Sequence, residues 1–540
     1  MQLRDTNISK LSETTYDALI IGGGINGAVS AAALSGKGVK TALIDQGDFA
    51  GLTSQESSNL AWGGIKYMET FEYGLVRKLC NSRNHLIRNY PSTVKEIRFF
   101  TTVPRGFRFP PLFIWLGAWL YWLMGNCFTK RPRYLTRKTI RSEEPAVNIE
   151  NAAGGVEYSD AYLHDNDARF VFGFIRSALT AGCIAANYVE AVQSERTRDG
   201  TWVTKARNRL TGDEFEIRSK SLINAAGPLA DDYNRTVRQE TQHRLLLSKG
   251  IHLIVKRITK KPRVLTFFSS DGRLFFIIPM GVRTCIGTTD TRVDHPTKEV
   301  TEGDRDFVLH NVNALLDLDK PIEKKDIIAE RCGVRPLVIK ANTGASADAD
   351  RMQLSRKHVI ETGQQEKHIT IFGGKLTDCL NVGNKICNII EGMGIQVPFP
   401  DYKWYGEPDQ ATKSRFFHLA RLADLDGYTS PESCENLSTR LWRRYGATAF
   451  TLLELIQENH DQAEVLIKGT EYIRCELREA ARREMVTKLE DFLRRRSKIA
   501  LIERPEIIKN APGLKEACEL LFGDQADEKI AEYFSDTHVV

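Results

Sequence analysis

The stretch Ala18-Leu-Ile-Ile-Gly22-Gly-Gly24-Ile-Asn-Gly27 lies near the start of the chain and decides the fold. Its apolar residues predict a buried strand, and the small residues of 28–34 predict a helix directly after the glycines. The glycines allow a tight turn and bring the backbone close to a diphosphate at the positive end of that helix. A second strand, predicted over 39–44, ends at Asp45, whose carboxylate can accept hydrogen bonds from a ribose. A strand, a helix and an acid at these spacings predict a dinucleotide-binding βαβ unit.

The dinucleotide motif occurs once, almost at the N-terminus. This placement favours a tightly held FAD over a dissociable NAD, although the glycine pattern is compatible with either. A glycine-rich turn of another α/β fold is the alternative, and the position of Asp45 argues against it.

Length and composition describe a globular protein of several domains. The chain has 540 residues, of which 42% are hydrophobic and 27% charged, and these values exclude collagen-like, disordered and multi-span membrane proteins. The ten cysteines include no C-x-x-C pair. We therefore expect no metal site, and we expect the thiols to serve as small apolar residues in a reducing compartment. Residues 1–15 are polar, contain no apolar leader segment and are predicted to be loose.

The pattern of apolar residues changes near residue 400. Residues 16–400 mix helical stretches with strand-like runs such as 274–278. Residues 401–412 are predicted to be a linker. The rest, 413–540, is typical of a helical domain, with long amphipathic helices predicted over 452–467 and 473–493.

Five further motifs follow in order along the chain. They are Thr53-Ser54-x-x-Ser57-Ser58, Trp62-Gly63-Gly64-Ile65-Lys66-Tyr67, Gly287-Thr288-Thr289-Asp290, Gly333-Val334-Arg335-Pro336-Leu337 and Phe372-Gly373-Gly374-Lys375-Leu376-Thr377. Singly, the first favours an ordinary serine-rich loop, and each cation favours a surface ion pair. Together with the N-terminal glycines, they make the chain resemble the FAD-dependent glycerol-3-phosphate dehydrogenases. That family is respiratory and quinone-linked, and it belongs to the D-amino-acid-oxidase-like flavoproteins.

The resemblance implies a fold, an activity and a group of site residues. The expected fold is α/β + α: a glucose-oxidase-like Rossmann domain with an interleaved antiparallel-sheet substrate cap, then a C-terminal helical domain. The expected reaction oxidises sn-glycerol 3-phosphate to dihydroxyacetone phosphate, with hydride transfer to FAD and electrons passed to membrane quinone. The residues implied to bind FAD are Gly22, Gly24, Asn26, Gly27, Asp45, Thr53, Ser54, Ser58, Gly63, Gly64, Gly227, Gly374, Lys375, Leu376 and Thr377. Those implied to face the substrate are Lys66, Tyr67, His252, Arg335, Arg356 and Lys375.

Two residues depart from the family pattern. Where the family usually has His-Gly-Gly-Leu-Arg-Tyr, this chain has Trp62 in place of the His and Lys66 in place of the Arg. Lysine keeps the charge of a phosphate-binding arginine but loses its planar fork. These departures leave two alternatives open. One is a related oxidoreductase that acts on another alcohol or an amino acid, and the other is a membrane-surface binding protein with eroded catalysis.

The implied chemistry needs a base and a clamp for phosphate. His252 is the first candidate for the base, because a neutral imidazole accepts protons near pH 7. A hydrogen-bonded structural histidine is the alternative. Arg335 and Arg356, together with Lys66, supply enough positive charge for a phosphate dianion.

The basic residues are concentrated around a short apolar segment. Residues 73–142 hold 14 Lys and Arg against one acid, Glu96, whereas 109–129 contain no charged side chain. The apolar run is shorter than the roughly 20 residues that a spanning helix needs. Trp115, Trp119 and Trp122 share one helix face. We therefore expect 105–133 to lie in an anionic membrane surface as a monotopic segment; a buried core helix is the alternative.

The expected partners follow from these features. They are a small phosphorylated polyol, a membrane quinone and an anionic membrane surface, so the expected location is peripheral, on the cytoplasmic face of the inner membrane. We expect no nucleic acid, because no recognition motif accompanies the basic run. A homodimer is one of the assemblies that the sequence leaves open.

Overall fold

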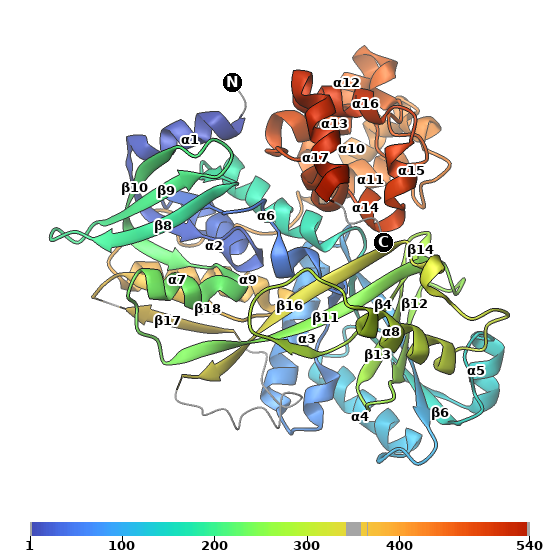
Figure 1. The fold of residues 1–540 in the computed structure, drawn as a ribbon. Helices are drawn as coiled ribbons and strands as arrows, with labels where there is room; N and C mark the ends of the chain where they lie inside the picture. Colours follow the sequence, from blue (N-terminus) through green and yellow to red (C-terminus); the bar gives the residue numbers. More distant parts are fainter. Residues whose placement is uncertain (1–2, 342–357, 364, 537–540) are drawn as a thin grey trace.

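The computed structural model describes residues 3–341, 358–363 and 365–536, and two sheets dominate it (Figure 1). One sheet carries the dinucleotide motif and the other forms a cap. The C-terminal helices lie against both, since Arg169 beside the first sheet pairs with Glu484, and Arg283 of the second pairs with Glu503. The predicted α/β + α architecture is confirmed.

The first sheet is the dinucleotide-binding sheet. Its strand order is β17-β18-β10-β1-β2-β7, and all of these pairs are parallel except β17–β18. The hairpin β8–β9 extends β10 in the antiparallel direction. The strands are β1 (Thr15–Ile21), β2 (Thr41–Ile44), β7 (Ile184–Ala186), β8 (Val189–Arg196), β9 (Trp202–Asn208), β10 (Glu214–Asn224), β17 (Val359–Gly363) and β18 (His368–Phe372).

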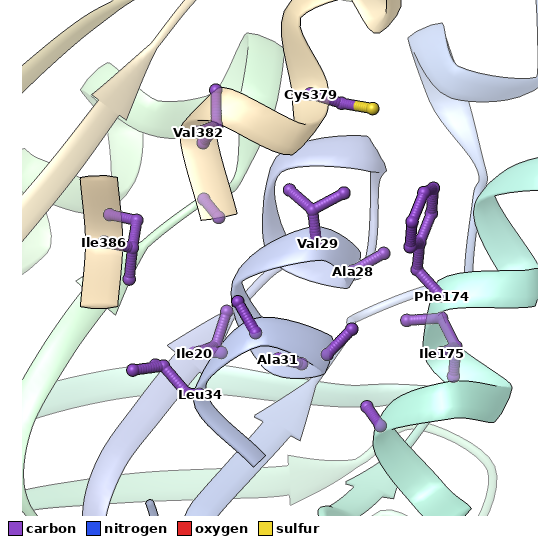
Figure 2. Packing of buried hydrophobic residues seen from close by; sticks show 14 of the residues in the cluster. Ile20, Ala28, Val29, Ala31, Leu34, Phe174, Ile175, Cys379, Val382 and Ile386 are labelled. Carbon is purple, nitrogen blue, oxygen red and sulfur yellow. The ribbon is translucent and has the colours of Figure 1, made fainter. Parts of the chain in front are cut away.

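Three helices pack together beside this sheet. They are α2 (Ile25–Gly36), α6 (Asp167–Thr180) and α9 (Cys379–Gly392). In Figure 2, Val29 of α2 lies between Phe174 of α6 and Val382 of α9. A Cβ atom on Gly27 would lie 1.8 Å from the Gly22 carbonyl oxygen, so only glycine lets α2 start this close to β1.

The N-terminal residues are ordered, which corrects one prediction. Helix α1 (Leu3–Glu13) occupies most of the segment 1–15 that we expected to be loose. Its Arg4 side chain is buried and donates to Asn208 Oδ1 at 2.7 Å, and the Asn7 amide donates to a backbone carbonyl at 2.8 Å. The polar residues that suggested a loose segment therefore satisfy buried polar groups of the neighbouring strands.

The second sheet forms the cap. Its order is β15-β11-β14-β13-β12-β4-β6-β3, with β16 paired to β11 and β5 paired to β6. The pairs are antiparallel, as expected, except that β4 and β12 run parallel. The strands are β3 (Leu60–Ala61), β4 (Val94–Pro104), β5 (Arg133–Leu135), β6 (Ala152–Leu163), β11 (His243–Lys256), β12 (Arg263–Phe268), β13 (Leu274–Met280), β14 (Arg283–Gly287), β15 (Thr291–Val293) and β16 (Ala329–Lys340). The helices α3 (Tyr73–Asn89), α4 (Pro111–Met124), α5 (Arg137–Glu143), α7 (Ala230–Thr236) and α8 (Glu302–Leu315) complete these two domains.

The C-terminal domain is helical, but its helices are shorter than predicted. The helices expected over 452–467 and 473–493 end at Glu458 and Arg483. Trp404, inside the predicted linker 401–412, is buried and donates to Asn384 Oδ1 at 2.8 Å. The helices are α10 (Gln410–Leu422), α11 (Leu437–Tyr445), α12 (Ala449–Glu458), α13 (Arg474–Arg483), the π-helix η10 (Asp491–Arg496), α14 (Ile499–Ile502), α15 (Pro505–Lys509), α16 (Leu514–Phe522) and α17 (Ala526–Asp536).

Buried ion pairs join this domain to the dinucleotide-binding sheet. Arg496 donates to both carboxylate oxygens of Asp48, at 2.8 and 2.9 Å, and Arg495 donates to the same carboxylate at 2.6 Å. Burial alone would raise the pKa of Asp48, but the two guanidinium groups outweigh it and hold that pKa below its usual value. Because the carboxylate and the guanidinium groups are buried and come from different domains, each domain neutralises charges of the other.

The cysteines are mostly buried, and the described helices are not of the kind that spans a membrane. All ten cysteines are free thiols, and only Cys127 and Cys434 are exposed. Burial raises the pKa of the Cys183 thiol to about 12, which keeps it protonated and unreactive. Within the described ranges, every helix is too short or too polar to span a bilayer.

Candidate functional site

The turn between β1 and α2 has the shape that a diphosphate needs. Gly22 has a positive φ of 102°, and Gly24, which precedes α2, has no side chain of its own to cap the N-terminus of that helix. Asp45 lies against the same turn, where its carboxylate accepts from the Gly23 amide at 2.6 Å and the Gly47 amide at 2.8 Å. Burial raises the pKa of Asp45 to about 6, while these two amides oppose that rise.

Residues from three other segments surround this turn. Ser54, in the 3₁₀ turn η1 (Leu52–Gln55), accepts from the Ile25 amide at 3.0 Å, and Thr53 donates to the Val334 carbonyl of β16 at 2.6 Å. The Asn26 side chain donates to the Gly373 carbonyl at 2.9 Å. The motifs at 22–27, 53–58 and 372–377 therefore meet at one place.

Two glycines with positive φ lie beside the turn, and one of them, Gly227, leaves open space. Gly227 begins the 3₁₀ turn η3 (Gly227–Leu229) with a φ of +60°, and no described atom lies within 4 Å of where its Cβ would be. Gly374 has a φ of +114°, and its Cβ would come to 3.3 Å from Asn26. Amide donors at a helix start, an acid at the end of β2 and open space over glycine fit a dinucleotide cofactor.

A cavity of about 310 Å³ lies at the cap sheet and brings together nine of the predicted site residues. The predicted site residues that line the cavity are Thr53, Ser58, Lys66, Tyr67, His252, Arg335, Lys375, Leu376 and Thr377. Its lining also includes Glu56, Trp62, Arg273, Leu274, Phe276 and Asp290. Arg356, which was predicted to face the substrate, lies outside the described residues. The lining carries four cations against two carboxylates, so it favours an anionic ligand.

Arg335 is held over the cap sheet by a glycine. A Cβ on Gly250 would lie 2.1 Å from an Arg335 guanidinium nitrogen, so the guanidinium occupies the space that a side chain would fill. It donates to Thr288 Oγ1 at 2.8 Å and to the Thr289 carbonyl at 3.3 Å. The Asp290 carboxylate lies 3.6 Å away. The motifs at 287–290 and 333–337 thus act together to orient one cation.

His252 is buried next to two cations. It lies on β11 opposite Gly287 of β14 and Arg331 of β16. Burial lowers its pKa from 6.5 to about 3, and the charges of Arg335 and Arg331 act in the same direction. Its Nδ1 atom is buried and has no hydrogen-bond partner among the described residues. The ring is therefore neutral at physiological pH, and it lines the cavity.

Trp62, Tyr67 and Lys375 meet at another wall of the cavity. Tyr67 lies in the 3₁₀ turn η2 (Ile65–Met68), and Lys375 directly precedes the 3₁₀ turn η6 (Leu376–Asp378). The Lys375 ammonium lies 4.1 Å from the centre of the Tyr67 ring and 5.8 Å from that of Trp62. The two rings are 6.3 Å apart. An aromatic pair thus faces the lysine of the last motif.

A buried carboxylate fixes the turn that carries Trp62. The Gly63 amide donates to Asp160 Oδ1 at 3.0 Å, and Gly64 follows with a φ of +80°. The Tyr121 hydroxyl of α4 donates to the same Asp160 oxygen at 2.7 Å, as does Arg83. Burial raises the pKa of Asp160, while Arg83 opposes that rise. The cavity wall is therefore joined to the buried face of α4.

Arg273 is a site residue that the sequence analysis missed. It lies at the tip of the β12–β13 hairpin, where it donates to Asp271 Oδ2 at 2.7 Å and to the Asp290 carbonyl at 3.2 Å. The turn sequence Asp271-Gly272-Arg273 was the available signal. Only the sheet register brings this turn beside Asp290, so its position could not be read from sequence spacing.

Comparison with known proteins agrees with this arrangement. A family model described as "FAD dependent oxidoreductase" matches residues 17–371. The chain belongs to the FAD-dependent oxidoreductase family. A second model, described as the C-terminal domain of alpha-glycerophosphate oxidase, matches residues 414–526 of this flavoprotein. FAD is therefore the cofactor of this flavoprotein, and the glycine turn with Asp45 has a geometry that fits it.

Named relatives of the flavoprotein are glycerol-3-phosphate dehydrogenases. A probable enzyme of this name from Encephalitozoon cuniculi is 27% identical over 93% of this chain and 81% of its own length. The aerobic enzyme from Staphylococcus aureus is 28% identical over 90% and 87%. The human mitochondrial enzyme is 30% identical over 72% of this chain, which spans 56% of that protein.

Solved structures show the same fold. The glycerol-3-phosphate dehydrogenase of Bacillus halodurans, complexed with FAD, superposes on this flavoprotein with a TM-score of 0.74. The two are 24% identical, and the match covers 99% of this chain and 97% of that one. A glycine oxidase from Geobacillus kaustophilus gives a TM-score of 0.52 over 71% of this chain. The likeness to the Bacillus structure extends further along this chain.

Proposed function

We propose that this flavoprotein oxidises sn-glycerol 3-phosphate to dihydroxyacetone phosphate. The observation that carries the proposal is the cavity, which places the neutral His252 and the oriented Arg335 beside further cations. Relatives that align along most of the chain are named for this substrate. A net positive lining suits a phosphorylated polyol better than a neutral amino acid.

The chain's own residues account for binding and proton transfer. Arg335 donates to the phosphate, and Lys66, Arg273 and Lys375 add positive charge around it. Bound FAD supplies the acceptor for the hydride that leaves C2. His252 receives the hydroxyl proton, so the carbinol loses one proton and one hydride and becomes a ketone. The phosphate also offsets the charge of Arg335, which should raise the pKa of His252 when the substrate binds.

The second part of the proposal concerns the membrane and the electron acceptor. We infer that electrons pass to a membrane quinone and that α4 rests in the anionic cytoplasmic surface of the inner membrane. Five apolar side chains of α4 support this inference because they are more than two-fifths exposed: Leu112, Phe113, Leu116, Leu120 and Leu123. Exposed cations flank the helix at Arg105, Arg108, Lys130, Arg131 and Arg133. Such a surface suits anionic lipid.

The exposed face of α4 differs from the one that the sequence suggested. The three tryptophans are half-buried and contact one another edge to face, with ring centres 6.0 and 5.4 Å apart. Trp122 donates to the Thr129 carbonyl at 2.6 Å. The leucines and Phe113 therefore form the outermost surface, and the tryptophans lie beside it.

Anaerobic titration of the purified flavoprotein tests the proposed reaction. Adding sn-glycerol 3-phosphate should bleach the visible absorbance of the flavin, while glycerol at the same concentration should not. Reduction by glycine or another amino acid instead would identify an amino-acid oxidase. A flavin that no substrate of either class reduces would support a binding protein with eroded catalysis.

A further inference from the structure

Trp62 and Lys375 come from distant parts of the chain and are joined at the cavity. The Thr377 hydroxyl donates to the Trp62 carbonyl at 3.3 Å, which ties the 62–67 turn to the 372–377 turn. Both rings that face the Lys375 ammonium, Trp62 and Tyr67, come from the first of these turns. An ammonium within about 6 Å of a ring centre is attracted to the ring face.

The indole of Trp62 is itself held in place. Its Nε1 lies 3.4 Å from the Tyr158 hydroxyl, to which it donates, and Tyr158 is stacked on Phe99 at 5.1 Å. An indole has one donor and no acceptor. Since that donor is directed to Tyr158, only the ring face of Trp62 can interact with Lys375.

We propose that Trp62 and Tyr67 form an aromatic cage that fixes the Lys375 ammonium at the substrate cavity. Trp62 is then a positioning residue that acts through Lys375 on anion binding, in the place where related enzymes have a histidine. The inference rests on the proposed function in one respect, since it takes the phosphate as the group that Lys375 meets. A cage of this kind restricts the flexible lysine stem, so the cation is already in place when the anion arrives.

A double-mutant cycle on the FAD-loaded enzyme tests the cage. The variants are Trp62→Leu, Trp62→Phe, Lys375→Met and the double variant Trp62→Leu/Lys375→Met. Inorganic phosphate is the probe, and its Kd is measured by calorimetry. Trp62→Leu should weaken phosphate binding about tenfold, since it removes a desolvated cation–π contact. Trp62→Phe, which keeps a ring, should stay within about threefold of the parent enzyme.

The double variant decides the mechanism. If Trp62 acts through Lys375, adding Trp62→Leu to Lys375→Met should change the Kd by less than about twofold. Equal effects of Trp62→Leu in both backgrounds would overturn the cage, as would a parent enzyme that does not bind phosphate. Tyr67→Leu, tested in the same two backgrounds, replaces Trp62→Leu in the cycle if that variant does not fold.

Kinetics with sn-glycerol 3-phosphate separate the cage from the proposed function. Trp62→Leu should raise KM about tenfold and leave kcat within about threefold, because the lysine binds the anion and does not react. Coupled phosphate binding without turnover of sn-glycerol 3-phosphate would leave the cage standing and overturn the proposed reaction. Turnover of sn-glycerol 3-phosphate with no coupling between Trp62 and Lys375 would support the proposed reaction and overturn the cage.

Discussion

His252 is buried beside two guanidinium groups, and burial is the larger influence on its pKa. Burial lowers the pKa to about 3, and Arg335 and Arg331 reinforce that shift. In the free enzyme the ring is therefore neutral over the whole physiological range. It is also a weak base there, so in the proposed reaction it needs the charge of a bound phosphate to become an effective proton acceptor.

The pH dependence of turnover should reveal this coupling. We expect kcat/KM, which reports the free enzyme, to show no protonation step of His252 near pH 6.5, because the pKa lies at about 3. The acid limb of kcat should lie at higher pH, since the bound anion raises that pKa. His252→Gln should lower kcat at least about 100-fold and remove that limb. A kcat/KM step near pH 6.5 that vanishes in His252→Gln would contradict the assignment.

Arg335 offers a second test at this scale. Arg335→Ala should lower kcat/KM for sn-glycerol 3-phosphate by about 100-fold, because a buried anion loses a charged donor. Arg335→Lys should recover only part of the loss, since lysine lacks the fork that also donates to Thr288 and Thr289. Flavin content serves as the control and should not change. Undiminished efficiency in Arg335→Ala would place the phosphate elsewhere.

The motifs singled out nine of the residues that line the cavity, but their mutual geometry could not be predicted. Thr53, Lys66, His252, Arg335 and Lys375, which were predicted site residues, all line this cavity. The role of Gly250 was invisible, because only the pairing of β11 with β16 places the Arg335 guanidinium above it. The position of a site residue that belongs to no recognisable motif, such as Arg273, also depends on the sheet register and could not be predicted from the sequence.

At the scale of the element, α4 shows how one helix can face two environments. Ala118 and Tyr121 are buried, and Tyr121 donates to Asp160 under the cavity wall. The opposite face exposes leucines and Phe113. Figure 1 places α4 at the bottom of the view, with the C-terminal helices at the top. A membrane bound at α4 would leave the helical domain free of lipid.

The exposed face of α4 should control membrane binding. Leu116→Gln/Leu120→Gln should reduce cosedimentation with vesicles that contain anionic lipid, because the substitutions remove apolar area from the contact. Leu422→Gln is the control, since Leu422 is 72% exposed but lies in the helical domain. Both variants should retain FAD. If Leu422→Gln released the enzyme from the vesicles, or if the α4 variant still bound them fully, α4 would not be the membrane contact.

Helix lengths were the least predictable feature of the elements. The apolar period of 452–467 looks continuous, but the Asn459 side chain accepts from the Asp461 amide at 2.9 Å and starts a new turn. In 473–493, helix α13 ends at Arg483, and Met485 follows with a φ of +50°, which lies outside the right-handed helical region. A side chain that competes for a backbone amide therefore interrupts the first segment, and a residue in the left-handed region interrupts the second.

Over the whole molecule, buried ion pairs make the helical domain part of one structure. The carboxylates of Asp48 and Asp165 belong to the flavin-binding half, and their guanidinium partners belong to the helical domain. A buried charge that loses its partner strongly favours unfolding. We therefore expect the two domains to unfold together rather than in separate steps.

Removing one partner should expose this dependence. Arg496→Ala should lower the free energy of unfolding by about 3 kcal/mol, since only Arg495 would remain to pair with the buried Asp48. Flavin release and loss of helical circular dichroism should still coincide. Arg235→Ala is the control, because the Arg235–Asp232 pair is 77% and 51% exposed and should contribute at most about 0.5 kcal/mol. Two separated transitions in the parent enzyme would disprove the dependence.

The distribution of the thiols gives the folded chain two natural attachment points. Cys127 follows α4, Cys434 lies in the helical domain, and the other eight cysteines are buried. A maleimide dye should therefore label only these two positions under native conditions. In a Cys434→Ser variant the dye would sit beside α4 alone, where its emission would report directly on contact with lipid.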